Sequence, residues 1–315
     1  MTIKEIYDLA IAKGIDADFR DNERIERSQE RLKAKFDKMG DRDKDEFDAE
    51  RLANPFSDSR ILFGDPEREV KKVLVGIDID GDEMLLAKEL GGIDLVISHH
   101  PRGKALAGLD DVMQLQIDVL NLHGVPVNVA EKLLNKRIDE VSRGISPSNH
   151  NRVVDMARHL DIPLMCLHTP CDNMAARFVD DKLKRDEPIF VEDVIGSLKE
   201  IPEYREAISF GAGPRIFLGG PDNRVGKVIT EMTGGTEGAP EIYEKLSQAG
   251  VGTVVGMHIS EKHRTEAEKA NINVVIAGHM SSDSIGMNIF LDWLEDSGID
   301  VLACSGLIRV SRLGK

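Results

Sequence analysis

The sequence is poor in several residue types that particular protein classes require. Aromatic residues make up 4% of the 315 residues, and the three cysteines include no CxxC pair. Since three cysteines cannot all be paired, we expect free thiols and a cytoplasmic location. No run of 18 apolar residues occurs, so we expect no membrane span. The first residues, MTIKEIYDLAIAKGID, contain acids and lack a long apolar stretch, unlike a secretory signal peptide.

Positive charge and phosphate-binding loops are also scarce. There are 41 Lys and Arg residues against 56 Asp and Glu residues, a net charge of -15. A surface this acidic repels phosphate backbones, so nucleic acid is not an expected partner. Neither GxGxxG at a strand–helix turn nor GxxxxGK[ST] is present, which excludes a dinucleotide fingerprint and a P-loop. The negative charge does not exclude an anionic small substrate, because a bound metal ion can reverse the local sign of charge.

The residues that are present favour a layered fold. With 41% apolar residues, the chain can form a core, and from residue 62 onward strand and helix patterns alternate. This alternation predicts an α/β fold with parallel βαβ units and helices on both faces of each sheet. The proline- and glycine-rich stretch 185–224 predicts either a domain junction or an embellishment of the fold. Strands are predicted within 70–79, 93–98, 125–130, 162–167, 224–235, 252–258, 272–279 and 299–306.

The first 60 residues differ from the rest. Residues 3–13 have the pattern of a short amphipathic helix, and residues 15–57 are rich in both charge signs. The segment 22–38 predicts an exposed helix with i,i+4 pairs such as Glu23–Arg27. We therefore expect a charged N-terminal extension that forms a solvated arm or lid.

Three predicted strands end in the same combination of residue types. Ligands of open parallel sheets lie at the carboxyl ends of the strands. Acids there can also cap a helix or face its dipole, but capping does not explain why histidines accompany them each time. The pattern therefore predicts a metal site. The residues are His99 and His100 after 93–98, His168 and Asp172 after 162–167, and His279 and Asp283 after 272–277.

This set of side chains suits two divalent ions. It contains more imidazoles and carboxylates than one tetrahedral ion needs. A carboxylate such as Asp172 or Asp283 can bridge two ions roughly 3.5 Å apart, and such pairs activate a shared water. Nitrogen and oxygen ligands suit Zn, Mn, Fe or Ni.

Other residues near these strand ends are candidates for catalysis. His168 precedes Cys171 by three residues, a spacing compatible with a cysteine nucleophile and its base. The sequence shows no orienting third group and no oxyanion hole, so a buried thiol is the favoured interpretation of Cys171. His258 also follows a predicted strand, and with His263 it is a candidate for proton transfer or substrate contact. We take His168 and His258 as the catalytic candidates.

At these residues the sequence resembles the NGG-interacting-factor-3-like family, also called type 2 GTP cyclohydrolase I-like proteins. The resemblance covers most of 61–310 and rests on three ordered blocks: GDPEREVKKVLVGIDI with IDLVISHHP, LMCLHTPCDN, and INVVIAGHMSSD. It implies a pair of divalent metals, with a nearby imidazole at His168. The ligands that it implies are His99, His100, Asp172, His279 and Asp283.

The resemblance also implies an architecture and a function. The fold would be two interlinked three-layer domains, with 61–185 plus 272–315 forming the metal-binding domain, 186–271 the second, and 1–60 the N-terminal helix and arm. The assembly would be a toroidal homohexamer with the metals facing an inner cavity. The activity would be that of a dinuclear metal-dependent hydrolase on a nucleotide or related small molecule, such as attack at C8 of GTP with formate release. The alternative is a non-catalytic metal-binding or scaffold ring protein.

The sequence departs from the family pattern at several places, which leaves room for a divergent subgroup with its own substrate. Cys171 replaces the usual apolar residue, the insert 15–57 is long, and RGKALAG replaces an aromatic-containing stretch after HHP. Asp283 stands where glutamate is usual and is one methylene shorter. Either the backbone has moved inward, or one ion is weakly bound; from sequence we expect one tight and one loose ion.

Overall fold

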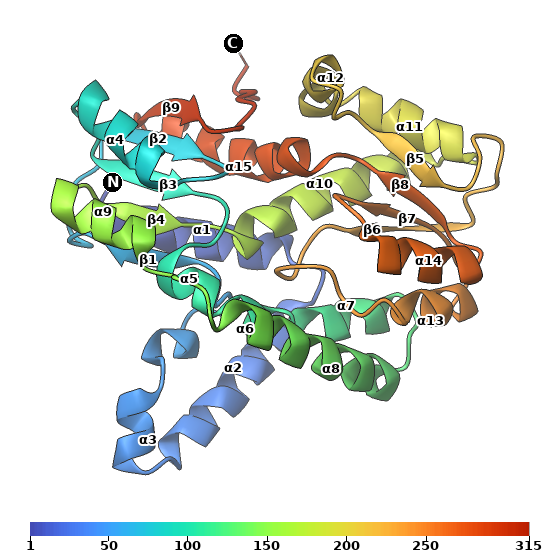
Figure 1. The fold of residues 1–315 in the computed structure, drawn as a ribbon, viewed down its shortest axis with the longest axis horizontal. Helices are drawn as coiled ribbons and strands as arrows, with labels where there is room; N and C mark the ends of the chain where they lie inside the picture. Colours follow the sequence, from blue (N-terminus) through green and yellow to red (C-terminus); the bar gives the residue numbers. More distant parts are fainter. Residues whose placement is uncertain (315) are drawn as a thin grey trace.

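The computed structural model describes residues 1–314 and contains two mainly parallel sheets with helices on their faces (Figure 1). The first sheet has the order β1-β4-β3-β2-β9 and the second β5-β8-β7-β6; only the edge strands β1 and β5 pair antiparallel. The predicted α/β class is confirmed. The strands are β1 Arg60–Phe63, β2 Lys72–Gly76, β3 Leu95–Ser98, β4 Leu164–Cys166, β5 Arg215–Leu218, β6 Lys227–Glu231, β7 Val251–Gly256, β8 Asn273–Ile276 and β9 Asp300–Cys304.

Helices cover the sheets and fill the space between them (Figure 1). Within residues 1–314, none combines the length and the apolar character that crossing a membrane requires. The helices are α1 Ile3–Ala17, α2 Asn22–Asp37, α3 Asp41–Glu46, the 3-10 turn η1 Ala49–Leu52, α4 Gly81–Leu90, α5 Gly103–Ala107, α6 Leu109–Val112, α7 Leu115–Leu122, α8 Val127–Ile145, α9 Arg152–Leu160, α10 Thr169–Asp186, α11 Val191–Lys199, α12 Pro202–Ser209, α13 Ile242–Gln248, α14 Glu261–Lys269 and α15 His279–Asp296.

Two long helices, α10 and α15, connect the two halves of the molecule. Helix α10 follows β4 of the first sheet, and α15 runs from β8 of the second sheet to β9 of the first. Met174 and Phe290 lie in the core of the first sheet, whereas Val179 and Ile285 lie in the core of the second. Because both helices belong to both cores, their N-terminal turns are held together between the sheets.

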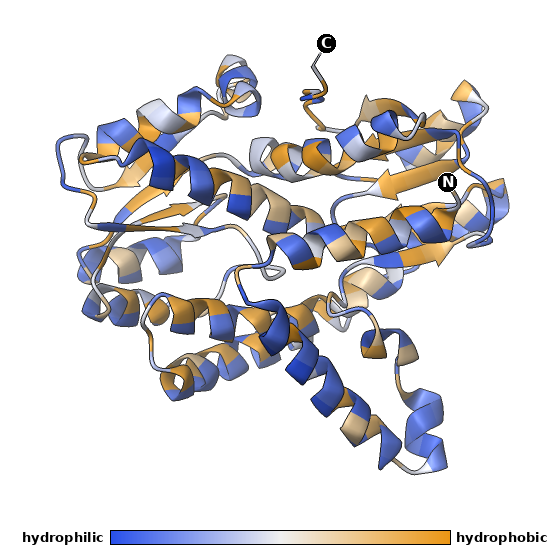
Figure 2. Cartoon of the chain, turned by 180° about the vertical axis from the view of Figure 1, so that it is seen from behind, coloured by the Kyte–Doolittle hydropathy of each residue, from blue (hydrophilic) through white to orange (hydrophobic). Residues whose placement is uncertain are grey.

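The N-terminal segment is not uniform. Helix α1 begins with a capping box at Thr2 and buries Ile3 and Ile6 completely in the first core. Helix α2 confirms the predicted exposed helix, pairs Glu23 with Arg27, and buries only Ile25. It projects with α3 from the body as a mostly hydrophilic pair (Figures 1 and 2). The exposed, charged part of this segment therefore consists of α2 and α3, whereas α1 is an integral part of the core.

The structure corrects several sequence-based assignments. The predicted strand 125–130 is wrong, because Pro126 caps α8 and the helix buries Ala130, Leu134 and Ile138 at four-residue spacing. The segment 185–224 contains α11, α12 and the short edge strand β5. Strand β8 pairs in the second sheet, so the chain returns to the first sheet with α15 and β9 and not at residue 272.

Candidate metal centre

The His99–His100 pair is fixed by the backbone of the strand before it. Beyond the end of β3, the parallel ladder continues, with the His99 amide donating to Gly76 O and the His100 amide to Ile77 O, both at 2.9 Å. The two side chains therefore start from a rigid base. His99 is fully buried, and the His100 side chain keeps 17% exposure.

The N-terminal ends of α10 and α15 each supply one histidine and one aspartate four residues apart, with His168 at the N-cap of α10 and His279 as the first residue of α15. This spacing places His168 with Asp172, and His279 with Asp283, on one face of a helical turn. Gly278 begins α15 with φ 117°, and a Cβ there would lie 2.7 Å from Ala212 O. Glycine at this position lets the chain turn sharply from β8 into the helix and brings Asp283 under the His99–His100 pair.

The side chains converge at distances longer than hydrogen bonds. His99 Nε2 lies 3.3 Å from Asp172 Oδ1 and 3.6 Å from Asp283 Oδ1. Asp283 Oδ2 lies 3.3 Å from His100 Nε2 and 3.6 Å from His279 Nε2, and His168 Nε2 lies 3.6 Å from Asp172 Oδ2. Two ligand atoms that are each about 2.1 Å from a tetrahedral ion lie about 3.4 Å apart. The spacing therefore fits atoms that share a metal ion.

Unpartnered buried atoms support the same interpretation. His99 Nε2, Asp172 Oδ1 and both carboxylate oxygens of Asp283 are buried without a hydrogen-bond partner. Buried polar atoms are nearly always bonded, so a group of such atoms that converges on one point fits a ligand-binding position. Two groups could hold a metal ion and share His99: His99, His100 and Asp283, and His99, His168 and Asp172.

The structure thus brings all six strand-end residues together. His168, predicted from sequence as a catalytic candidate, lies inside one of the two groups. His279 contacts the other group through Asp283, and its side chain keeps 39% exposure.

In three histidines of the cluster, the ring nitrogen Nδ1, which faces away from the other ligand atoms, lies near a hydrogen-bond acceptor. Nδ1 of His99 lies 3.0 Å from Leu167 O, Nδ1 of His100 lies 2.9 Å from Asp78, and Nδ1 of His168 lies 2.8 Å from Asp58. Such acceptors assign the proton to Nδ1 and direct the Nε2 lone pair toward the centre.

Sequence reasoning missed both aspartates. Asp78 follows β2 and shares the strand-end signal that revealed the other acids, whereas Asp58 lies in a loop after the charged arm with no comparable signal.

The cluster stabilises positive charge. Burial lowers the pKa of His99, but Asp283 and Asp172 outweigh it and raise that pKa well above its usual value. Burial also opposes ionisation of Asp283, yet His99, His100 and His279 hold its pKa far below the usual range. Burial lowers the pKa of His168, and Asp172 and Asp58 overcome that effect and raise it. A cation at this point is therefore favoured by the surrounding acids.

Cys171 does not have the environment of a nucleophile. Its side chain is fully buried, and burial raises the pKa of the thiol above its usual value despite the neighbouring His99. Reactive cysteines are partly exposed and have lowered pKa values. The structure favours the buried-thiol interpretation.

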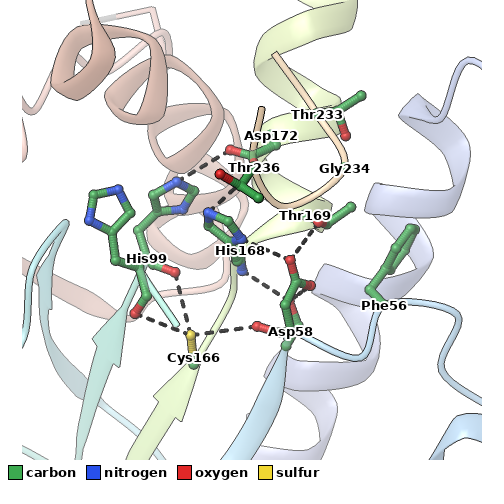
Figure 3. Close-up of polar contacts among 12 residues, drawn as sticks. Phe56, Asp58, His99, Cys166, His168, Thr169, Asp172, Thr233, Gly234 and Thr236 are labelled. Carbon is green, nitrogen blue, oxygen red and sulfur yellow. Dashed lines mark hydrogen bonds and ion pairs between the residues drawn. The ribbon is translucent and has the colours of Figure 1, made fainter. Parts of the chain in front are cut away.

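A pocket opens over one side of the cluster and encloses about 580 Å³ of empty space, part of it open to solvent. His168, Asp172, His279 and Asp283 line it, together with residues on and after strands β6 and β7 of the second sheet that include Glu231, Glu237 and His258. A loop carrying Thr233, Gly234 and Thr236 passes beside Asp172 (Figure 3). Gln116 fixes this loop by donating to Gly234 O and Thr236 O.

The two other histidines at this pocket differ in their contacts. His258 Nδ1 lies 3.3 Å from Glu237, which raises the pKa of His258, and its ring centroid lies 4.9 Å from that of His279. His263 is buried, and its ring nitrogens contact Ser260 Oγ and Gly238 O. His258 thus keeps access to the pocket, whereas His263 is held in place by local contacts.

Comparison with known proteins gives one informative set of matches. No model of a protein family matches the chain, and neither does any curated protein. Among solved structures, a NIF3 superfamily protein from Sphaerobacter thermophilus is 29% identical, with a TM-score of 0.72, over 80% of this chain and 92% of that protein. Reduced HcgD from Methanocaldococcus jannaschii shares the fold, with a TM-score of 0.52 and 15% identity over 82% of this chain and 93% of that one. The resemblance to the NIF3-like family that the sequence predicts is confirmed: the chain is similar in sequence and fold to a NIF3 superfamily protein.

Proposed function

We propose that the protein is a metal-dependent hydrolase that acts on a small molecule. The observation that carries this proposal is the position of the unpartnered ligand atoms at the wall of an open pocket. Structural metal sites are closed by protein ligands, whereas catalytic sites keep a position open to substrate and water. Here Asp172, Asp283 and His279 belong both to the cluster and to the pocket wall.

The residues have separate tasks in this proposal. His99, His100, Asp172, His279 and Asp283 would hold two divalent ions, chosen from Zn, Mn, Fe or Ni, with His168 beside Asp172. Bound divalent ions supply Lewis acidity and lower the pKa of water. His258, oriented by Glu237 and adjacent to His279, is assigned to proton transfer with the substrate.

The substrate would present an electrophilic carbon or phosphorus to the cluster. No lysine or arginine is among the described residues that line the pocket. The phosphates of a nucleotide would therefore depend on the bound ions for neutralisation. GTP ring opening and phosphoester hydrolysis are both candidate reactions, since either uses activated water.

The first test measures metal content and turnover together. We expect purified protein to carry up to two transition-metal ions per chain and to hydrolyse at least one compound in a screen of GTP, other nucleotides and phosphoesters. His99→Ala should lower the metal content and abolish turnover, because His99 is the residue shared by both candidate groups. His159→Ala, at an exposed position of α9, is the matched control and should match the wild type.

The result also separates enzyme from scaffold. Metal bound by the same residues without turnover of any compound would favour the non-catalytic ring protein. Full metal occupancy in a variant that lacks all five proposed ligands would show that the site is wrong.

The family resemblance also supports a homo-oligomer, and we propose a hexameric ring. Light scattering should then give a mass about six times the 34.8 kDa of one chain. A clean monomer at micromolar concentration would contradict an inner metal-lined cavity. Removal of helices α2 and α3 should leave the number of chains in the assembly unchanged, because these helices project away from the body (Figure 1).

A further inference from the structure

Asp58 is a buried carboxylate that lies outside the proposed ligand set. It is fully buried, and its Oδ2 accepts hydrogen bonds from His168 Nδ1 at 2.8 Å and from Thr169 Oγ1 at 2.6 Å (Figure 3). Among residues 1–314, no lysine or arginine pairs with it. Burying a carboxylate is costly unless it is paired and hydrogen-bonded, so its contact with His168 calls for a functional explanation.

The loop that carries Asp58 is rigid. The side chain of Asn54 donates to Phe56 O at 2.9 Å and to Ser59 O at 3.0 Å, and its oxygen accepts from the Phe56 amide at 2.7 Å. The buried Arg60 guanidinium donates to the same two carbonyls, at 3.1 and 2.8 Å. The carboxylate of Asp58 is therefore presented on a pre-formed turn.

The same loop also holds the backbone of His168. Ser59 Oγ accepts from the His168 amide at 2.9 Å, while Asp58 accepts from the His168 ring. Backbone and side chain of one residue are thus fixed by two consecutive loop residues. With Nδ1 bound in this way, the ring directs Nε2 toward Asp172, 3.6 Å away.

We propose that Asp58 is a positioning residue that sets the tautomer and orientation of His168, so that His168 Nε2 serves as a metal ligand with His99 and Asp172. The proposal rests on the proposed metal function. Aspartates that accept from the outer nitrogen of a ligand histidine fix its ring and raise its basicity. The turn between the charged arm and β1 is then part of the metal centre.

The experiment compares Asp58→Asn with Asp111→Asn. The asparagine keeps the shape of the aspartate but is a weaker acceptor and can also donate. Asp111 holds the same loop, accepting from Ser57 Oγ at 2.6 Å and from Arg51 at 2.7 Å, without touching His168. Any effect of general loop loosening should therefore appear in both variants.

Two readouts are measured. In metal-free protein, at a pH where the ring is neutral, nitrogen NMR of labelled histidine should show His168 protonated on Nδ1 in the wild type and in Asp111→Asn, and a mixture of tautomers in Asp58→Asn. Competitive titration with Zn²⁺ should show an affinity about 10- to 100-fold lower for Asp58→Asn, the range typical of lost outer partners, and a wild-type affinity for Asp111→Asn.

Each contrary result overturns the proposal. A wild-type His168 ring protonated on Nε2 would exclude the proposal. This measurement needs no variant, so the proposal stays testable even where Asp58→Asn does not fold. Equal loss of Zn²⁺ affinity in both variants would assign Asp58 a purely structural role. Absence of Zn²⁺ binding in the wild type would refute the metal function, while the NMR readout would still report whether Asp58 sets the tautomer.

Discussion

Gly286→Ala is expected to destabilise the protein and to empty the metal centre. Gly286 lies on α15 where it crosses α10, and a Cβ there would lie 2.0 Å from Cys171 O and 2.7 Å from Cys171 C. Both atoms are backbone, so no change of rotamer relieves the overlap. The helices must separate, and overpacking of this kind costs about 1–3 kcal/mol, sometimes more.

The loss of metal follows from the positions of the ligands on these two helices. Asp172 directly follows Cys171, and Asp283 lies one turn before Gly286. Metal–ligand distances tolerate errors of only about 0.2 Å, so a separation of the helices pulls the two carboxylates out of bonding range. The substitution thus acts on the fold and on the site through one contact.

Thermal unfolding and metal analysis of the purified variant test this expectation. Gly196→Ala is the matched control, because Gly196 lies inside α11 and an added Cβ meets no atom within 4 Å. That change should leave metal content unchanged and raise stability by up to about 1 kcal/mol, since alanine is the better helix former. A Gly286→Ala protein with the melting temperature and metal content of the wild type would contradict this prediction, because it would show that neither stability nor metal binding depends on the close contact between α10 and α15.

The fold was predictable where the sequence repeats a physical pattern. Strands β2, β3, β7 and β8 are short runs rich in β-branched and other apolar residues, as buried parallel strands require. The strand-end rule also singled out all six residues of the cluster, because strand direction places each of them after the carboxyl end of its strand. The rule did not show that these strands belong to two different sheets, with β3 and β4 in the first and β8 in the second.

Other features depend on contacts that are distant in sequence. Edge strands β1 and β5 are four residues long and only partly buried, and each contains only three apolar residues, too short a run to predict a strand. Helix α8 was mistaken for a strand because β-branched Val127 and Val129 occupy its first turn. Asp58 approaches His168 across 110 residues of chain, and the need for glycine at 286 arises only when two helices cross.

Asp283→Glu is expected to weaken metal binding, contrary to what the sequence alone suggests. The sequence favoured one loose ion on the assumption that aspartate falls short of the position a longer glutamate would reach. In the structure its carboxylate already lies 3.3 Å from His100 Nε2 and 3.6 Å from both His99 Nε2 and His279 Nε2. The close crossing at Gly286 and the turn at Gly278 hold the start of α15 close to α10 and to the cluster.

A longer side chain therefore does not fit at the position that the aspartate oxygens occupy between the histidines. Asp283 is 1% exposed and faces histidines on three sides, so one more carbon–carbon bond of about 1.5 Å drives its oxygens past the ligand position or displaces a ring. Competitive titration with Zn²⁺ should show lower affinity and fewer ions per chain in Asp283→Glu than in the wild type.

Asp292→Glu is the matched control for this prediction. Asp292 is a nearly buried aspartate of the same helix, about 13 Å farther along it, and it accepts from Arg309 and from the Arg312 amide. The same added methylene there should leave Zn²⁺ binding unchanged, whatever it does to stability. If Asp283→Glu instead bound a second ion more tightly than the wild type, the aspartate would be too short after all, and the inward position of α15 would not compensate for it.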